Sequence, residues 1–173
     1  LRRGTFPFLG ANLALTGTAS ASSTGFSAPP HNAIDGDTDG NYGNGSIFHS
    51  GDGAPEEPRF WEVDLGAEQG IGRVHVWFRT DCCGDRNDNF TLRILAGDRS
   101  ELWSTTYPGR PPVDVDYTIA PLLNGRFVRW EPGPRRALGE GNFHLAEVQV
   151  YGGFDPLKLT ITPDMAPNAY VSV

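Results

Sequence analysis

The sequence lacks several features that mark common classes of protein. No apolar run approaches the length of a membrane-spanning helix, and segments with a helical pattern are few. Lysine and arginine number 14 against 21 aspartates and glutamates, which gives a formal charge of −7. Because binding to a phosphate backbone requires clustered cations, we do not expect nucleic acid as a partner. Without a long apolar run, we do not expect direct insertion into a membrane either.

Cysteine is also scarce: Cys82 and Cys83 are the two in the chain, and they are adjacent. Neighbouring Cα atoms lie about 3.8 Å apart across a trans peptide, below the usual range for a disulfide. A bond between the two would be flat and rigid and would close no loop, so it would stabilise the fold little as a cross-link. It would serve better as a rigid apolar surface beside a ligand. The alternative is a pair of ordinary thiols. The Cys-x-x-Cys spacing of redox sites is absent.

Glycine and proline are abundant, with 22 and 14 residues, and short apolar runs lie between them. Runs bounded by Gly, Pro, Asn or Asp at this spacing are typical of a β-sandwich or barrel. A chain of 173 residues is long enough for one domain with a hydrophobic core. We therefore predict an all-β domain with strands at residues 60–65, 73–80, 90–95, 102–107, 113–119, 127–131 and 143–151.

The last of these runs, residues 143–151, changes its pattern partway. Apolar residues occupy odd positions up to Leu145 and even positions from Val148 onward. A change of parity within one strand predicts a β-bulge, here at Ala146 and Glu147. Such a bulge would direct the Ala146 carbonyl and the Glu147 carboxylate toward one point, where they could serve as two ligands of a cation.

An acidic segment carries aspartates at positions 35, 37 and 39, followed by Gly40. This spacing resembles the start of an EF-hand loop, but the twelfth position is Ser46, where that loop needs a bidentate Glu, and flanking helical patterns are missing. We expect a hard cation held by oxygen atoms, with Ser46 and backbone carbonyls completing the shell. The alternative is a solvated acidic turn.

Residues 79–86 gather two arginines, two aspartates and both cysteines, and they follow an alternating run that predicts a half-buried strand. The cluster therefore lies where the chain leaves the sheet, a common position for a binding site. Each guanidinium is a planar fork of five donors, so a pair can hold a ligand rich in lone pairs, such as hydroxyls on adjacent sugar carbons. An enzyme using Asp81 and Asp85 as paired acids is not expected, because the adjacent arginines would keep both ionised.

Three further runs resemble the framework of discoidin-like β-sandwich domains: Asn12-Leu-Ala-Leu-Thr-Gly-Thr-Ala, Ala33-Ile-Asp-Gly and Phe60-Trp-Glu-Val-Asp-Leu-Gly. With Arg79-Thr-Asp-Cys-Cys and Arg86 added, the chain resembles the F-type lectins, or fucolectins, over residues 12–152. The resemblance implies an eight-stranded jelly-roll-like antiparallel β-sandwich. It also implies a non-catalytic lectin whose partners are glycans with terminal α-L-fucose.

The polar sugar contacts of that family carry over to Arg79, Arg86 and a histidine, for which His49 is the candidate because its neighbours match. The 29 residues between His49 and Arg79 exceed the usual spacing, so the loop at residues 51–59 is expected to be longer. The usual spacing would place Asp52 at the histidine position. The resemblance implies that Asp81 fixes an arginine rotamer and that a disulfide between Cys82 and Cys83 lies against the sugar. Candidates for the apolar wall around the fucose methyl group are Phe48, Tyr42, His31 and Phe26.

The resemblance also implies a structural calcium ion. Its ligands would be Asn32, Asp35, Asp37, Ser46, Ala146 and Glu147. Relatives on the same scaffold bind other ligands, so the alternative function is a discoidin-like adhesion module for another sugar or for phospholipid headgroups.

Three regions are expected along the chain. Residues 1–11 form a lead-in segment and residues 12–152 the lectin domain. Residues 153–173 form a linker followed by an extra strand or by the first strand of another β module in a longer parent chain. A bonded cysteine pair and the lectin resemblance together imply a secreted or extracellular protein.

Overall fold

The computed structural model describes residues 10–51, 58–134 and 141–153, so the tail at 154–173 and most of the lead-in segment lie outside the described residues. Within them, regular structure consists of strands and short 3-10 turns, without an α-helix. None of the described segments is a helix of the length and hydrophobicity needed to cross a membrane. The strands are β1 (Thr18–Ala21), β2 (Phe48–His49), β3 (Trp61–Trp77), β4 (Thr91–Leu95), β5 (Glu101–Thr106), β6 (Asp114–Glu131), β7 (His144–Leu145) and β8 (Glu147–Gly152). The turns are η1 (Leu13–Thr16), η2 (Pro30–Ile34), η3 (Tyr42–Asn44) and η4 (Gly84–Asn87).

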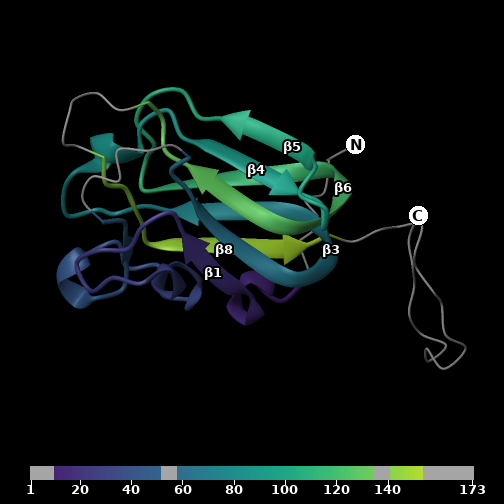
Figure 1. The fold of residues 1–173 in the computed structure, drawn as a ribbon, viewed down its shortest axis with the longest axis horizontal. Coiled ribbons are helices and arrows are strands. Elements are labelled where there is room, and N and C mark those ends of the chain that lie inside the picture. Colours follow the sequence, from purple (N-terminus) through teal and green to yellow (C-terminus); the bar gives the residue numbers. More distant parts are fainter. Residues whose placement is uncertain (1–9, 52–57, 135–140, 154–173) are drawn as a thin grey trace, which may run out of the picture.

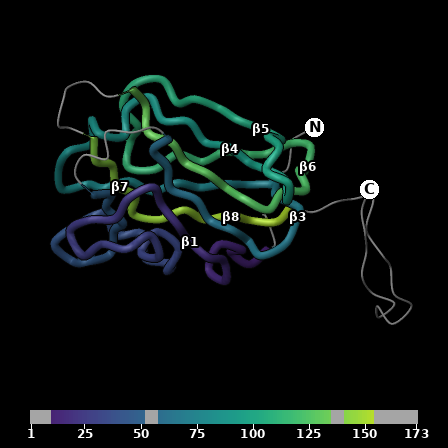
Figure 2. Tube along the Cα trace, in the orientation of Figure 1, coloured from purple at the N-terminus to yellow at the C-terminus, as the bar shows by residue number. Residues whose placement is uncertain are grey.

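Two long antiparallel strands, β3 and β6, pair with each other at the centre of the sheet (Figure 1). The first half of β3 pairs with β1 and with the end of β6, and its second half pairs with β8 and with the start of β6. Beyond β6 the sheet continues through β4 to β5. The short strands β2 and β7 pair with each other, and β7 leads directly into β8 (Figure 2).

The sequence predicted two strands where the structure has one, both at β3 and at β6. The runs 60–65 and 73–80 are halves of β3, and the runs 113–119 and 127–131 are halves of β6. The register between the two strands shifts at Asp64/Gln69 and again at Ile71/Arg73. Exposed and small residues at these shifts interrupt the apolar alternation although the strands continue, which is why the pattern predicted a break.

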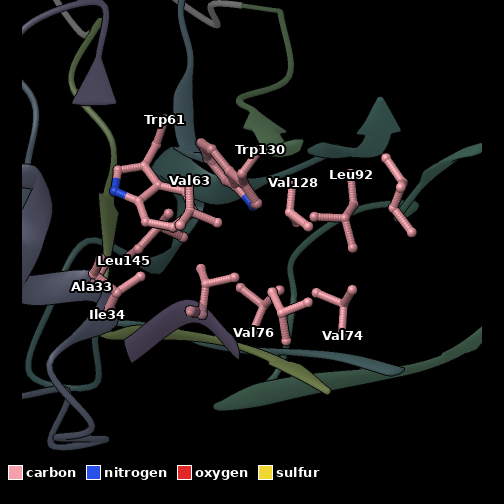
Figure 3. Packing of buried hydrophobic residues seen from close by; sticks show 14 of the residues in the cluster. Ala33, Ile34, Trp61, Val63, Val74, Val76, Leu92, Val128, Trp130 and Leu145 are labelled. Atoms are coloured by element: carbon pink, nitrogen blue, oxygen red, sulfur yellow. The ribbon is translucent and has the colours of Figure 1, made fainter. Parts of the chain in front are cut away.

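The bend in β3 allows its two halves to face each other across the core. Figure 3 shows Trp61, Val63, Val128 and Leu92 on one side of the core, opposite Val74, Val76 and Ile34. Each of these side chains is completely buried, which stabilises the fold by roughly 1.5–3 kcal/mol for a Val, Leu or Ile side chain. The all-β sandwich that the sequence predicted is confirmed.

The run predicted as one strand with a β-bulge at Ala146 and Glu147 is divided there into two strands, of which β7 pairs with β2 and β8 pairs with β3. β7 ends at Leu145, β8 begins at Glu147, and both Leu145 and Val148 are buried in the core. The Ala146 N–H donates to the Trp77 carbonyl oxygen at 2.9 Å, which keeps this point attached to the end of β3. As a result the Glu147 side chain is also buried, with 0% exposure.

Candidate functional site

The cluster predicted at residues 79–86 lies on the loop that follows β3, and two neighbouring segments fix its position. The Phe78 N–H donates to the Val113 carbonyl oxygen, and the Thr80 N–H donates to the Gly40 carbonyl oxygen, each at 2.9 Å. A Cβ atom on Gly40 would lie 2.5 Å from the Phe78 carbonyl oxygen, so only glycine allows this approach. The acidic segment around residue 40 and the arginine–cysteine loop (residues 79–86) are therefore packed against each other.

Arg79 is held in one orientation. Its Nε and Nη2 atoms donate to the two carboxylate oxygens of Asp81 at 2.6 and 2.9 Å, and only 10% of its side chain is exposed. The hydrogen bonds from Arg79 lower the pKa of Asp81 to about 2, and a weaker contact from the Tyr42 N–H acts in the same direction. The guanidinium carbon also lies 4.8 Å from the centre of the Tyr42 ring. This pair uses Nε and Nη2, which leaves Nη1 outside it.

His49, on β2, is buried, and the Tyr42 ring lies near both His49 and Arg79. Its Nδ1 lies 2.7 Å from the Ser50 carbonyl oxygen, and since a carbonyl only accepts, Nδ1 carries the proton. When the ring carries this proton alone, Nε2 is an acceptor. The ring is surrounded by Phe26 at 4.5 Å, Tyr42 at 6.1 Å and His144 at 5.5 Å between ring centres.

Cys82 and Cys83 are joined by a disulfide, as expected, with their Cα atoms 3.8 Å apart. Cys82 is exposed, and Cys83, which directly precedes η4, has a left-handed backbone (φ = 59°). Arg86 lies on η4, where its N–H donates to the Cys83 carbonyl oxygen at 3.2 Å. Its guanidinium makes no hydrogen bond within the part of the chain that the structure describes.

Two buried residues that the sequence did not single out anchor this loop. The Asn87 amide nitrogen donates to the His144 carbonyl oxygen at 2.9 Å, and the His144 N–H lies 3.4 Å from the Asn87 amide oxygen. Burial, reinforced by His49 and by the two arginines, lowers the pKa of His144 to about 3, so this imidazole stays neutral. In the sequence, His144 stands between the apolar residues Phe143 and Leu145. This pattern indicates a strand, but it does not show that His144 contacts Asn87.

The four candidates for an apolar wall have different positions. Tyr42 and Phe26 contact the His49 ring, and the Tyr42 hydroxyl donates to the Phe26 carbonyl oxygen at 3.0 Å. Phe48 is fully buried and packs against Phe143 at 5.6 Å, so it supports the cluster from the core and does not line it. His31 is exposed on η2 and takes no part in the ring contacts described above. Asp52, the alternative to His49, lies outside the described residues.

Two of the predicted cation ligands, Asp35 and Asp37, lie close enough to the buried carboxylate of Glu147 for their charges to act on it. Its Oε1 accepts a hydrogen bond from the Gly36 N–H at 3.2 Å, and its Oε2 has no hydrogen-bond partner among the described residues. Burial, reinforced by the charges of Asp35 and Asp37, raises the pKa of Glu147 to about 8. A buried oxygen atom without a partner, next to two more carboxylates, fits the requirements of a bound cation.

The loop that faces Glu147 is folded by its own side chains. The Asn32 amide donates to the carbonyl oxygens of Gly45 and Ile47, both at 3.0 Å, and the Ser46 hydroxyl donates to that of Asp39 at 2.5 Å. No three His, Cys, Asp or Glu side chains of residues 10–51, 58–134 and 141–153 form a metal site by themselves. Amide, hydroxyl and carbonyl oxygens would therefore have to complete the shell, and such an oxygen-only donor set suits calcium.

Comparisons with known proteins agree with this geometry. Residues 32–129 match the family model described as NedA-like, galactose-binding domain. Fucolectin-3 of Anguilla japonica is 40% identical over 97 residues, which cover 52% of this chain and 49% of that protein. Fucolectin of Anguilla anguilla is 36% identical over 125 residues, which cover 69% of this chain and 73% of that protein.

Among solved structures, the fucose binding module SpX-3 of Streptococcus pneumoniae is 28% identical, with a TM-score of 0.72. The alignment covers 82% of this chain and 97% of the module. The match to the Anguilla japonica relative spans about half the length of that protein. These relatives are lectins and carbohydrate-binding modules, which do no catalysis. The chain therefore belongs to the NedA-like galactose-binding domain family and, within its discoidin-like β-sandwiches, to the F-type lectins, which are non-catalytic carbohydrate-binding proteins.

Proposed function

We propose that this lectin binds terminal α-L-fucose on glycans through Arg79, Arg86 and His49. The observation that carries the proposal is the preorganised Arg79, which is fixed by Asp81 on the same loop as the bonded cysteines. The names of the relatives, which are fucolectins and a fucose binding module, support the choice of sugar.

Fucose is neutral, so the arginines act on it as strong hydrogen-bond donors and not as ion-pair partners. The Nη1 atom of Arg79 and the guanidinium of Arg86 supply donors, and the His49 ring contributes its Nε2 atom. These groups address the 3-OH, the axial 4-OH and the ring oxygen. A sugar with an equatorial 4-OH would leave such donors unpaired, which is how polar sites discriminate between epimers.

The apolar side of the sugar has its own partners in this proposal. The Cys82–Cys83 disulfide lies against the apolar edge of the ring, and Tyr42 and Phe26 stand around the methyl group. Because the disulfide and the Arg79–Asp81 pair are rigid before the sugar arrives, little loop entropy is lost on binding. An exposed disulfide persists in an oxidising compartment, which supports an extracellular protein.

We also propose that calcium is a structural cofactor, held by the oxygens of Asn32, Asp35, Asp37, Ser46, Ala146 and Glu147. The unpaired Oε2 of Glu147 supports this assignment. The ion would compensate the buried carboxylate and join β8 to the acidic segment; it would not contact the sugar.

Titration calorimetry with L-fucose and its 4-epimer tests the sugar site. Wild-type protein should bind L-fucose with a Kd in the micromolar to millimolar range, as is typical of small polar ligands on shallow sites. Arg79→Ala, Arg86→Ala and His49→Ala should each weaken binding by at least about tenfold. The matched control is Arg126→Ala, which removes an arginine paired with Asp64 on a different part of the sheet.

Full affinity in both arginine variants would place the sugar elsewhere. Equal binding of the two epimers would contradict the proposed recognition of the axial hydroxyl.

A further inference from the structure

His144 is a polar residue in a completely buried position next to the proposed sugar site. It begins β7, and its neighbours Phe143 and Leu145 are, like His144 itself, 0% exposed. Its partner on β2 is His49, and the two imidazole centres lie 5.5 Å apart. Apolar residues occupy most positions of this kind, and a buried polar ring is destabilising unless its nitrogen atoms have partners. The groups around the ring therefore indicate its role.

The contact with Asn87 fixes the tautomer of His144. The Asn87 amide nitrogen lies 3.4 Å from Nδ1 of the ring, and its hydrogen bond to the His144 carbonyl oxygen at 2.9 Å holds it there. The Asn87 amide oxygen faces the His144 N–H at 3.4 Å, which agrees with this orientation of the amide. Because an amide nitrogen only donates, Nδ1 is the acceptor and the neutral ring carries its proton at Nε2.

The acceptor available to this proton is the carbonyl oxygen of Cys83. Nε2 makes no regular hydrogen bond to the described residues, but the Cys83 carbonyl acts on the ring: it raises the pKa of His144, against the larger effect of burial. An acceptor that faces an imidazole N–H has this effect. The same carbonyl oxygen accepts from the Arg86 N–H at 3.2 Å, and its two lone pairs allow both interactions.

We propose that His144 is a positioning residue of the fucose site, whose Nε2–H holds the Cys83 carbonyl and whose Nδ1 holds Asn87. This inference rests on the proposed fucose site. Because the ring also lies against His49, it fixes the disulfide and Arg86 relative to that histidine. The ring is buried, so it acts on the sugar only through these residues. A phenylalanine or leucine would fill the same space but would hold neither partner.

The test compares two amide side chains that replace one ring nitrogen each. The amide of His144→Gln reaches the position of Nε2 and can donate to the Cys83 carbonyl, whereas the shorter amide of His144→Asn reaches only the position of Nδ1. Titration calorimetry should show the Kd of L-fucose raised by about three- to tenfold in His144→Asn, as expected for the loss of one hydrogen bond, and by less than about twofold in His144→Gln. Scanning calorimetry should show a lower Tm in both variants, because neither amide fills the space of the ring.

Val128→Ala is the matched control for a loss of stability without a change at the site. Val128 is 0% exposed on β6, where it pairs with Val63 of β3 and Ile94 of β4. This variant should have a lower Tm and the same Kd as the wild type. If His144→Asn does not fold, Asn87→Ser makes the comparison from the other side of the contact: it releases Nδ1 without changing β7, and it should raise the Kd likewise.

Equal affinity in His144→Gln and His144→Asn would overturn the proposal, whether both match the wild type or both weaken in step with Tm. A wild-type protein that does not bind L-fucose would instead contradict the proposed fucose site.

Discussion

The carboxylate of Asp81 controls the orientation of Arg79. The low pKa of this carboxylate predicts the pH at which the pair, and with it fucose binding, is lost. The hydrogen bonds from Arg79 lower the pKa of Asp81 from the usual value of 3.8 to about 2. A carboxyl with a lowered pKa contributes its full stabilisation above the unfolded value, and this contribution is lost as the pH falls through the folded value. We therefore expect the Arg79–Asp81 pair, and with it fucose binding, to be lost between about pH 4 and pH 2.

The variant Asp81→Asn separates this pair from other effects of acid. It should bind L-fucose more weakly at pH 7, because the guanidinium is no longer fixed, while its Tm stays within about 2 °C of wild type, since exposed ion pairs contribute roughly 0–1 kcal/mol. Calorimetry at a series of pH values, with circular dichroism to confirm folding, measures both. Wild-type affinity in Asp81→Asn at pH 7 would show that Arg79 needs no such support.

Site residues differed in how far the sequence could predict them. Arg79, Arg86 and the cysteines lie within eight consecutive positions, so their proximity follows from the chain itself. The roles of Tyr42 and Asn87 depend on contacts with segments distant in sequence, which no local pattern shows. Phe48 was misplaced for a related reason: a two-residue strand is too short for its alternation to reveal which side chain enters the core.

The arginine–cysteine loop is an element whose ends are fixed independently of its disulfide. Thr80 is hydrogen-bonded to Gly40 at one end, and Asn87 is hydrogen-bonded to His144 at the other. The disulfide closes a ring across a single peptide bond, so it constrains little of the unfolded chain, and the entropic stabilisation it provides should be small.

We therefore expect the double variant Cys82→Ser, Cys83→Ser to melt within a few degrees of wild type but to bind L-fucose about three- to tenfold more weakly. The loss of affinity follows because the flat apolar plate against the sugar becomes two mobile polar side chains. Calorimetry of unfolding and of binding gives both values on the same samples. A large decrease in Tm with unchanged affinity would instead show that the disulfide acts mainly as a cross-link that stabilises the fold.

The sequence predicted elements best where their pattern was uninterrupted. In the second half of β3, Val74 and Val76 are buried and Arg73 and His75 partly exposed, as the alternation indicated. The strand β1, with the sequence Thr-Ala-Ser-Ala, was not predicted, because small residues carry little contrast between buried and exposed positions. Its place in the sheet depends on pairing with β3, which is a property of the whole fold and not of the segment.

Across the whole molecule, the proposed calcium ion would connect parts of the chain that are far apart in sequence. Glu147 begins β8 near the end of the described chain, and Gly36, which donates to its carboxylate, lies 111 residues earlier. Without a cation the fold buries the Glu147 carboxyl beside Asp35 and Asp37, with its pKa raised to about 8. Near pH 7 the folded protein must then either bury a charge or take up a proton at Glu147, and both lower its stability. The acidic segment also supplies Gly40 and Tyr42 to the arginine–cysteine loop.

Because a ligand that binds only the folded state stabilises it, the Tm of the wild-type protein should rise with calcium concentration and fall in excess chelator. Glu147→Gln is the sharpest variant, since its amide oxygen can still accept from the Gly36 N–H while the charge is removed. This variant should show no response to calcium, and in chelator it should melt at or above the temperature of the chelated wild type, because a glutamine needs neither a buried charge nor the uptake of a proton. Differential scanning calorimetry of both proteins, with and without calcium, makes the comparison, and magnesium serves as the ion control. A wild-type Tm that is unchanged by chelator would refute the calcium site, whereas a calcium response that persists in Glu147→Gln would place the ion away from β8.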